Sequence, residues 1–259
     1  MTQAVHAYYE QGREHDRLRE GRGRLEFWRT QDVLRRLLPP PPARVLDVGG
    51  GTGVHAEWLG ADGYEVELLD PIPLHVERAS RMAGLTARLG DARRLPVPDA
   101  SVDAVLLLGP LYHLTDRADR VRALAEARRA VRPGGLVAAA TINRYAAVHD
   151  TVYLGAYLDE PQRQAAHAAL AEGIMSSPRG FSAYLHDPGE VPGEFADAGF
   201  PDVRQYGLEG AFWLYGDVND WLDDPQRRQL MLDAQRSVES VPSLLGISGH
   251  LLTVTRRDG

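Results

Sequence analysis

An apolar run that ends in glycines, followed by an acid at a fixed distance, carries the most chemical information in this chain. Residues 45–53 read VLDVGGGTG, so a short strand runs directly into glycines. Glycine in such a turn lets backbone N–H groups approach a ligand closely, because no Cβ stands in the way. Asp70 follows about 20 residues later, at the end of a second apolar run, where a carboxylate can accept hydrogen bonds from both hydroxyls of a ribose.

The glycine spacing separates two kinds of nucleotide-binding loop. A dinucleotide-binding G-x-G-x-x-G counted from Gly49 requires glycine where Val54 stands. Counted from Gly51, it requires glycine where Ala56 stands. The loop is not that fingerprint, which disfavours an oxidoreductase that uses NAD.

Two further segments follow the third and fourth apolar runs. Gly90-Asp91-Ala92 comes after the third run, where Asp91 can meet an adenine amino group. Gly109 and the residues up to His113 come after the fourth. Ligands of open α/β sheets bind beyond the carboxyl ends of the strands, so Tyr112 and His113 are expected near the reacting atoms.

Strand and helix patterns alternate from residue 44 onwards, which predicts βαβ units and a parallel sheet. Strands are expected at 44–48, 65–70, 86–89, 104–108, 136–141, 202–206 and 249–256. Helices are expected near 55–59, 74–82, 117–131 and 187–199. We predict a doubly wound, Rossmann-like α/β fold with a mainly parallel, seven-stranded sheet.

The remaining segments are expected to cover the sheet edge that binds the ligand. Residues 1–38 are predicted to form a helical N-terminal lid, separated by four prolines from an α/β domain at 39–259. Two insertions, 143–186 and 208–247, are rich in aromatic residues and histidine. We expect them to form a cap over the C-terminal edge of the sheet.

The composition excludes several kinds of chemistry. The 259 residues include no cysteine, so disulfides, thiolate metal sites and cysteine nucleophiles are excluded. Lysine is also absent, which excludes a P-loop lysine and a Schiff base. The net charge of −7 and the lack of a basic block argue against a nucleic-acid partner. No H-E-x-x-H or similar histidine pair occurs, so no metal is expected.

The sequence shows no pattern typical of a membrane span or a signal peptide. No apolar run approaches the roughly 20 residues that span a bilayer, and the first residues lack a basic segment followed by an apolar one. We therefore expect a cytoplasmic protein with a small-molecule substrate and no membrane partner. A monomer and a homodimer both remain open.

Taken together, these motifs resemble those of the class I S-adenosylmethionine-dependent methyltransferases, in particular the small-molecule members. Asp47-x-Gly49-x-Gly51-x-Gly53 has the spacing of their first motif, and residues 127–135 are similar to the turn before their fifth strand. The resemblance is detailed over 44–141 and reaches residue 256 by topology, which implies an antiparallel seventh strand.

The resemblance implies S-adenosylmethionine as cofactor and assigns residues to its parts. Asp47 would reach the methionine amino group, Asp70 would hold the ribose, and Asp91 would meet the adenine. In the lid, Tyr9 would cover the cofactor, and Arg29 or Arg17 would pair with its carboxylate. The full set of expected cofactor-binding residues is Tyr9, Arg29, Asp47, Gly49, Gly51, Asp70, Asp91, Ala92 and Gly109.

The implied reaction is an in-line methyl transfer to an O or N nucleophile of a small molecule, helped mainly by positioning. His113 is the expected base because histidine titrates near neutral pH. Tyr112 would cover the sulfonium with its ring, and Asn143 would line the acceptor site. His250 is expected to have a structural part.

Two alternatives share the cofactor. The fold could use S-adenosylmethionine for a non-methyl transfer or a cyclisation, or the protein could be a non-catalytic, cofactor-binding regulator. The Asn-Pro-Pro-aromatic motif of nucleic-acid amino-methylating members is absent, and Gly109-Pro110-Leu111-Tyr112 stands in its place. This departure argues against methylation of nucleic-acid bases.

Overall fold

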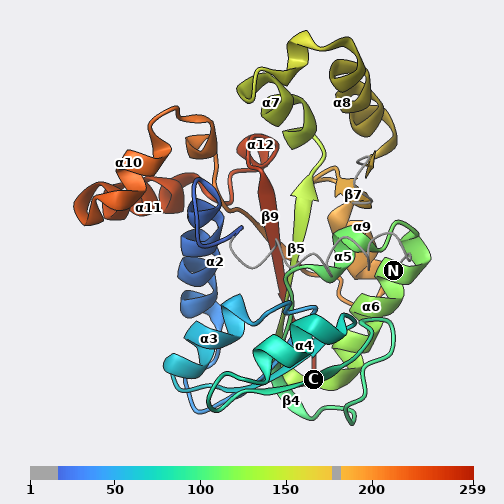
Figure 1. Cartoon of the computed structure of the whole chain (residues 1–259). Helices are drawn as coiled ribbons and strands as arrows, with labels where there is room; N and C mark the ends of the chain where they lie inside the picture. The colour runs from blue at the N-terminus through green and yellow to red at the C-terminus, as the bar shows by residue number, and fades with distance from the viewer. Residues whose placement is uncertain (1–16, 177–181) are drawn as a thin grey trace.

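A central sheet with helices on both faces organises the molecule (Figure 1). The computed structural model describes residues 17–176 and 182–259. The strands of this described part are β1 (Arg44–Val48), β2 (Glu65–Asp70), β3 (Thr86–Leu89), β4 (Val102–Leu107), β5 (Val131–Asn143), β6 (Ile174–Ser176), β7 (Ser182–His186), β8 (Arg204–Gly207) and β9 (His250–Arg256).

The pairing of these strands confirms the predicted α/β fold with a mainly parallel sheet. β3, β2, β1, β4 and β5 pair in parallel in that order. β9 runs antiparallel between β5 and β8. The described chain also forms a hairpin of β6 and β7, which the prediction of seven strands missed, and β7 joins the end of β5 at Ile142 and Asn143.

Helices cover both faces of the sheet (Figure 1). α2 and α3 lie on one face, and α6 and α9 lie on the other. In the described residues the helices are α2 (Gly23–Leu37), α3 (Val54–Ala61), α4 (Pro73–Ala79), α5 (Pro110–His113), α6 (Arg117–Ala130), α7 (Ala146–Tyr153), α8 (Glu160–Glu172), α9 (Val191–Asp197), α10 (Val218–Asp223), α11 (Pro225–Val238) and α12 (Pro242–Leu245), with 3-10 turns at Ala156–Leu158 and Phe212–Leu214.

The burial of the central strands explains their sequence. Most residues of β1 and β4 and residues 135–141 of β5 are buried, so these stretches read as largely apolar runs rather than alternating ones. Leu46 and Val105 contribute to the core under α6, while Leu106 contributes to the core under α2. The buried strands hold their carboxyl ends at one edge of the sheet, and the site residues lie at that edge.

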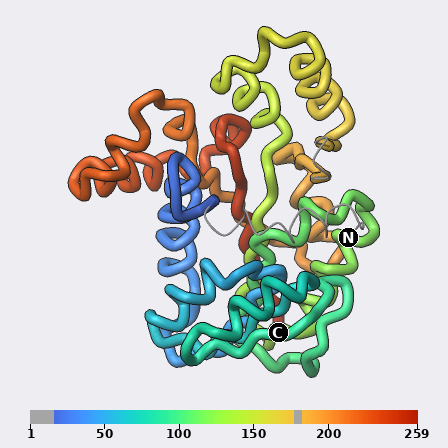
Figure 2. Tube along the Cα trace, viewed as in Figure 1, coloured from blue at the N-terminus to red at the C-terminus, as the bar shows by residue number. Residues whose placement is uncertain are grey.

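The two inserted segments lie at the carboxyl end of the sheet (Figure 2). α7 and α8 follow β5 and stand beyond its end, and α10 and α11 lie beside the start of α2. Leu25 of α2 packs against Trp213 and Met231. No helix in the described residues is both long and apolar enough to cross a membrane. The division into lid, domain and cap remains a prediction.

Candidate functional site

The glycine loop after β1 adopts a backbone that favours glycine. Gly49 and Gly51 have φ values of +69° and +58°, in the left-handed region. A Cβ at Gly49 would lie 2.7 Å from Cγ of Pro110. The Gly51 N–H donates to Oδ2 of Asp70 at 2.9 Å, which ties the loop to the end of β2. The loop thus brings backbone and an acid to the same edge of the sheet.

Asp70 is buried and held in one orientation at the end of β2. Its Oδ1 accepts the Ile72 N–H at 2.9 Å and lies 3.0 Å from Nδ1 of His75. Together with the Gly51 N–H on Oδ2, these contacts fix the carboxylate beside the glycine loop. The fixed acid is where the sequence predicts a contact with a ribose.

Asp47 is a buried carboxyl whose two oxygens have no hydrogen-bond partner among the described residues. Burial, together with the nearby charge of Asp70, raises the pKa of Asp47 to about 7. A buried acid without a partner is unfavourable when ionised, and a cation beside it removes that cost. The residue therefore suits a ligand that carries an ammonium group, such as an amino acid moiety.

A cavity of about 320 Å³ joins these groups. Of the predicted residues, its walls include Asp47, Gly49, Gly51, Asp70, Asp91, Ala92, Gly109, Tyr112 and His113. Asp91 is exposed, and hydrogen bonds from Arg93 together with the positive charge of Arg93 hold the pKa of Asp91 below its usual range. We call this space the first cavity.

A second cavity, of about 690 Å³, shares part of its wall with the first. Arg17, Glu26 and Tyr112 line both spaces. The remaining wall comes mainly from the inserted segments and from β9, and includes Trp213 and His250. The arrangement suits one ligand in each cavity, with the two in contact near the shared wall.

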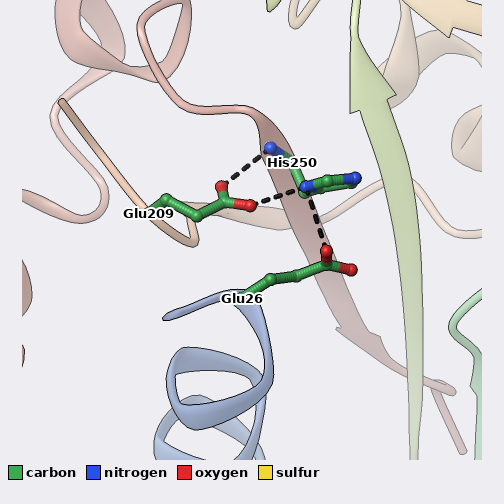
Figure 3. Close-up of side chains that lie close together, drawn as sticks. All are labelled: Glu26, Glu209 and His250. Atoms are coloured by element: carbon green, nitrogen blue, oxygen red, sulfur yellow. Dashed lines mark hydrogen bonds and ion pairs between the residues drawn. The ribbon is translucent and has the colours of Figure 1, made fainter. Parts of the chain in front are cut away.

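Glu26, Glu209 and His250 form a cluster at the edge of the second cavity (Figure 3). Nδ1 of His250 lies 2.6 Å from Oε1 of Glu209 and 3.5 Å from Oε2 of Glu26. The His250 backbone N–H and the Ser248 hydroxyl both donate to Oε2 of Glu209 at 2.8 Å. Arg17 holds Glu26 through Nη1 at 2.6 Å from Oε2.

The charged groups of this cluster shift the pKa values of His250 and Glu26. Burial alone would lower the pKa of His250, but the carboxylates of Glu26 and Glu209 outweigh it and raise the pKa. Burial alone would raise the pKa of Glu26, but Arg17 and His250 lower it to about 2. Two carboxylates thus face one imidazole and one guanidinium, and they favour protonation of the imidazole.

Two predicted site residues have other roles. Arg29 is fully buried, and its guanidinium donates to the Leu208 carbonyl and pairs with Asp32 and Glu239. It lines neither cavity, so the expected contact with a cofactor carboxylate is corrected.

Asn143 is also buried and serves the backbone. Its amide donates to the carbonyls of Leu245 and Ser248, and its oxygen accepts the Tyr145 N–H. It lines neither cavity, so the expected acceptor-site role is corrected as well. Both Arg29 and Asn143 are polar side chains that satisfy buried hydrogen-bonding groups. Their positions in the sequence do not distinguish this structural role from a role in ligand binding.

The remaining expectations concern His113 and Tyr9. Burial lowers the pKa of His113 to about 4, although a hydrogen bond with the Ser182 backbone opposes the shift. His113 lines the first cavity and not the second. Tyr9 lies outside the residues that the structure describes.

Sequence reasoning assigned His250 a structural part and gave no role to Glu26 or Glu209. The three residues come from α2, from the loop after β8 and from the first position of β9. No local motif joins them, and only the fold brings their side chains together. The one available signal was Glu209, an acid that follows the strand predicted at 202–206.

Comparisons with known proteins match the part of the chain that carries the glycine loop. The family described as "Methyltransferase domain" matches residues 46–139. An uncharacterized methyltransferase of Mycobacterium tuberculosis is 45% identical over 116 residues, which cover 44% of this chain and 45% of that protein. A demethylmenaquinone methyltransferase of Beutenbergia cavernae is 32% identical over 166 residues, which cover 64% of this chain and 65% of that protein.

A solved structure extends the likeness to the whole fold. A chain from the complex between the Haloferax volcanii Trm112 methyltransferase activator and a methyltransferase has a TM-score of 0.63 at 21% identity, covering 100% of both chains. The first curated relatives, in contrast, are matched over less than half of their length. Residues 46–139 thus match the methyltransferase domain family, and the whole chain has the fold of a solved structure from a methyltransferase complex.

Proposed function

We propose that this protein transfers the methyl group of S-adenosylmethionine to an O or N nucleophile of a small-molecule acceptor. The observation that carries the proposal is the pair of cavities with a common wall of Arg17, Glu26 and Tyr112. The first cavity would hold the cofactor and the second the acceptor. An in-line transfer requires the two ligands to be held in contact.

The residues of the first cavity fit the cofactor in chemical terms. Asp47, buried without a partner, suits the ammonium group, and Asp70 suits the ribose hydroxyls. Asp91 and Ala92 lie where the adenine is expected, and Gly109 begins the turn into α5. When bound, S-adenosylmethionine supplies an electrophilic methyl group on a sulfonium.

The second cavity supports an acceptor of modest size with both apolar and polar parts. Trp213, Met175 and Ile142 give it an apolar wall, while His250 and Glu26 give it a charged one. The relative named as a demethylmenaquinone methyltransferase supports a ring system of the quinone type. We therefore choose 1,4-dihydroxynaphthalene, a reduced two-ring quinone, as the first probe acceptor.

The first test is calorimetric titration of the purified protein with S-adenosylmethionine, S-adenosylhomocysteine and NAD. We expect micromolar binding of the first two and none of NAD. Asp70→Asn should weaken binding at least about tenfold, the effect of a lost hydrogen bond to a charged group. The matched control is Asp99→Asn, since Asp99 is 78% exposed and lies outside both cavities. A preference for NAD would overturn the proposal.

Product analysis then separates the two cofactor-consuming reactions. Methyl transfer to the probe leaves S-adenosylhomocysteine, whereas loss of the aminobutyrate arm leaves methylthioadenosine. Tight cofactor binding with neither product, across hydroxyl and amine probes, would favour the regulatory alternative. Mass and NMR analysis of the methylated probe identify the atom that received the methyl group.

A further inference from the structure

We propose that His250, oriented by Glu209, is the general base that takes the proton from the acceptor's nucleophile. The inference rests on the proposed function, because it requires an acceptor in the second cavity. It narrows the acceptor to a molecule whose nucleophile carries a proton, such as a hydroxyl group. Three features of the cluster support it.

The first feature is the orientation of the imidazole. Glu209 accepts the Nδ1 proton at 2.6 Å and the His250 backbone N–H at 2.8 Å. A hydrogen bond from Nδ1 to a carboxylate sets the tautomer of a neutral histidine and leaves the Nε2 lone pair available. Glu209 is 3% exposed and accepts from the Ser248 hydroxyl as well, so it acts as a positioning residue.

The second feature is the direction in which Nε2 points. Figure 3 shows this atom on the side of the ring away from both carboxylates. No described residue forms a hydrogen bond with it. The His250 side chain is 21% exposed and lines the second cavity, so an acceptor can reach it. His113, the base expected from sequence, lines only the first cavity.

The third feature is the charge around the ring. Glu26 from α2 and Glu209 from the loop after β8 face His250, and Arg17 lies beyond Glu26. The other charged groups in the wall of the second cavity are Glu20 and the pair Arg22–Asp150. The two carboxylates stabilise the imidazolium that forms once the proton has been taken.

The same three groups also offer ligand atoms within 4.8 Å of one another, as a metal site does. Arg17 argues for a proton network instead. Its guanidinium holds both oxygens of Glu26, through Nη1 at 2.6 Å and Nη2 at 3.2 Å. A divalent cation would have to displace this guanidinium from Glu26.

The step balances as a single displacement. The acceptor hydroxyl gives its proton to Nε2 of His250 while its oxygen forms a bond to the methyl carbon. The carbon–sulfur bond breaks, and its electron pair stays on sulfur. The products are the methylated acceptor, S-adenosylhomocysteine and an imidazolium that returns its proton to solvent through the exposed cavity.

The experiment measures turnover of 1,4-dihydroxynaphthalene from pH 5 to 9 for the full-length protein and its variants. His250→Gln should lower kcat by 10²- to 10⁴-fold, the usual size of general-base catalysis, without changing cofactor affinity. Glu209→Gln should lower kcat less. Glu26→Gln should move the pH–rate midpoint to lower pH, because the imidazolium loses a stabilising charge. The matched control is His167→Gln, an exposed histidine of α8 that should keep wild-type turnover.

A second measurement does not depend on turnover. The imidazole nitrogens of His250 are followed by NMR in the S-adenosylhomocysteine complex, and addition of the probe should shift Nε2 far more than Nδ1. An unchanged Nε2 signal, or wild-type kcat in His250→Gln, overturns the inference. Turnover abolished by a chelator and restored by a divalent cation also overturns it, in favour of a metal site. Failure of the proposed function looks different, since the wild type would then bind no S-adenosylmethionine or form no S-adenosylhomocysteine with any probe.

Discussion

Asp47 is a buried acid whose surroundings disfavour its charged form in the folded protein. Its carboxyl is buried and has no hydrogen-bond partner in the described chain, and its pKa is raised from 3.8 to about 7. Over that range of pH the folded protein retains a proton that the unfolded chain releases. The free energy of unfolding therefore falls as pH rises from about 4 to about 7.

Replacing this acid with its amide should stabilise the folded protein and weaken cofactor binding. Asp47→Asn removes the charge, so at pH 8 without cofactor we expect it to be more stable than the wild type by on the order of 2–4 kcal/mol. The variant should also bind S-adenosylmethionine at least about tenfold more weakly, since the ammonium loses its partner. Urea unfolding at pH 4 and pH 8 measures the first effect, and titration measures the second. Parallel pH dependence of stability in variant and wild type would contradict this account.

At the scale of an element, the glycine loop is held between β1 and the start of α5. Gly49→Ala places a Cβ 2.7 Å from Pro110 and keeps φ at +69°. We expect a loss of about 1–2 kcal/mol from the backbone alone, and weaker cofactor binding as the loop shifts. The control is Gly60→Ala in α3, where nothing lies within 4 Å and alanine should stabilise by up to about 1 kcal/mol. Equal effects of the two substitutions would show that the loop tolerates a side chain.

The elements differ in how well their sequence predicts them. The bounds of β1, β2 and β3 agree with the prediction, because turn residues bound each of these short strands on both sides. α9 is shorter than expected, since Asp187 accepts the Gly189 N–H and forms a turn where the helix was predicted to start. β6 and β7 were missed because strands of 3 and 5 residues inside an aromatic-rich insertion leave no clear alternation.

The site divides in the same way. Several residues of the first cavity stand at the end of a strand or shortly after it, so local sequence places Asp70 and Asp91 at one edge of the sheet. The position of His250, the proposed general base, depends on contacts between segments far apart in the chain, such as its contact with Glu26. Arg29 was misassigned for the same reason, because its partner Glu239 lies at the end of α11.

At the scale of the whole molecule, a buried ionic network fastens α2 to α11. Arg29 lies 2.5 Å from Glu239 and also pairs with Asp32, while Arg36 and Arg236 complete the network from the surface. Since α2 also carries Glu26, this network fixes one wall of both cavities.

Breaking the network should cost much more than breaking a surface pair. Arg29→Met leaves Asp32 and Glu239 buried beside fewer positive charges, and we expect a loss of about 3–5 kcal/mol. Arg81→Ala removes an exposed pair with Glu77 and should cost less than about 0.5 kcal/mol. Urea unfolding at neutral pH compares them. A loss below about 1 kcal/mol for Arg29→Met would show that this network does not secure the helix.

The shared wall has a thermodynamic consequence for the order in which ligands bind. Arg17, Glu26 and Tyr112 touch both cavities, so a ligand in one restricts side chains that the ligand in the other must also meet. Linkage makes any such coupling free energy mutual. If the bound cofactor raises the affinity for an acceptor by some factor, the bound acceptor raises the affinity for the cofactor by the same factor. In the proposed reaction the cofactor loses its sulfonium charge. Because the two sites are coupled, that loss changes the affinity of the protein for the methylated acceptor as well as for S-adenosylhomocysteine.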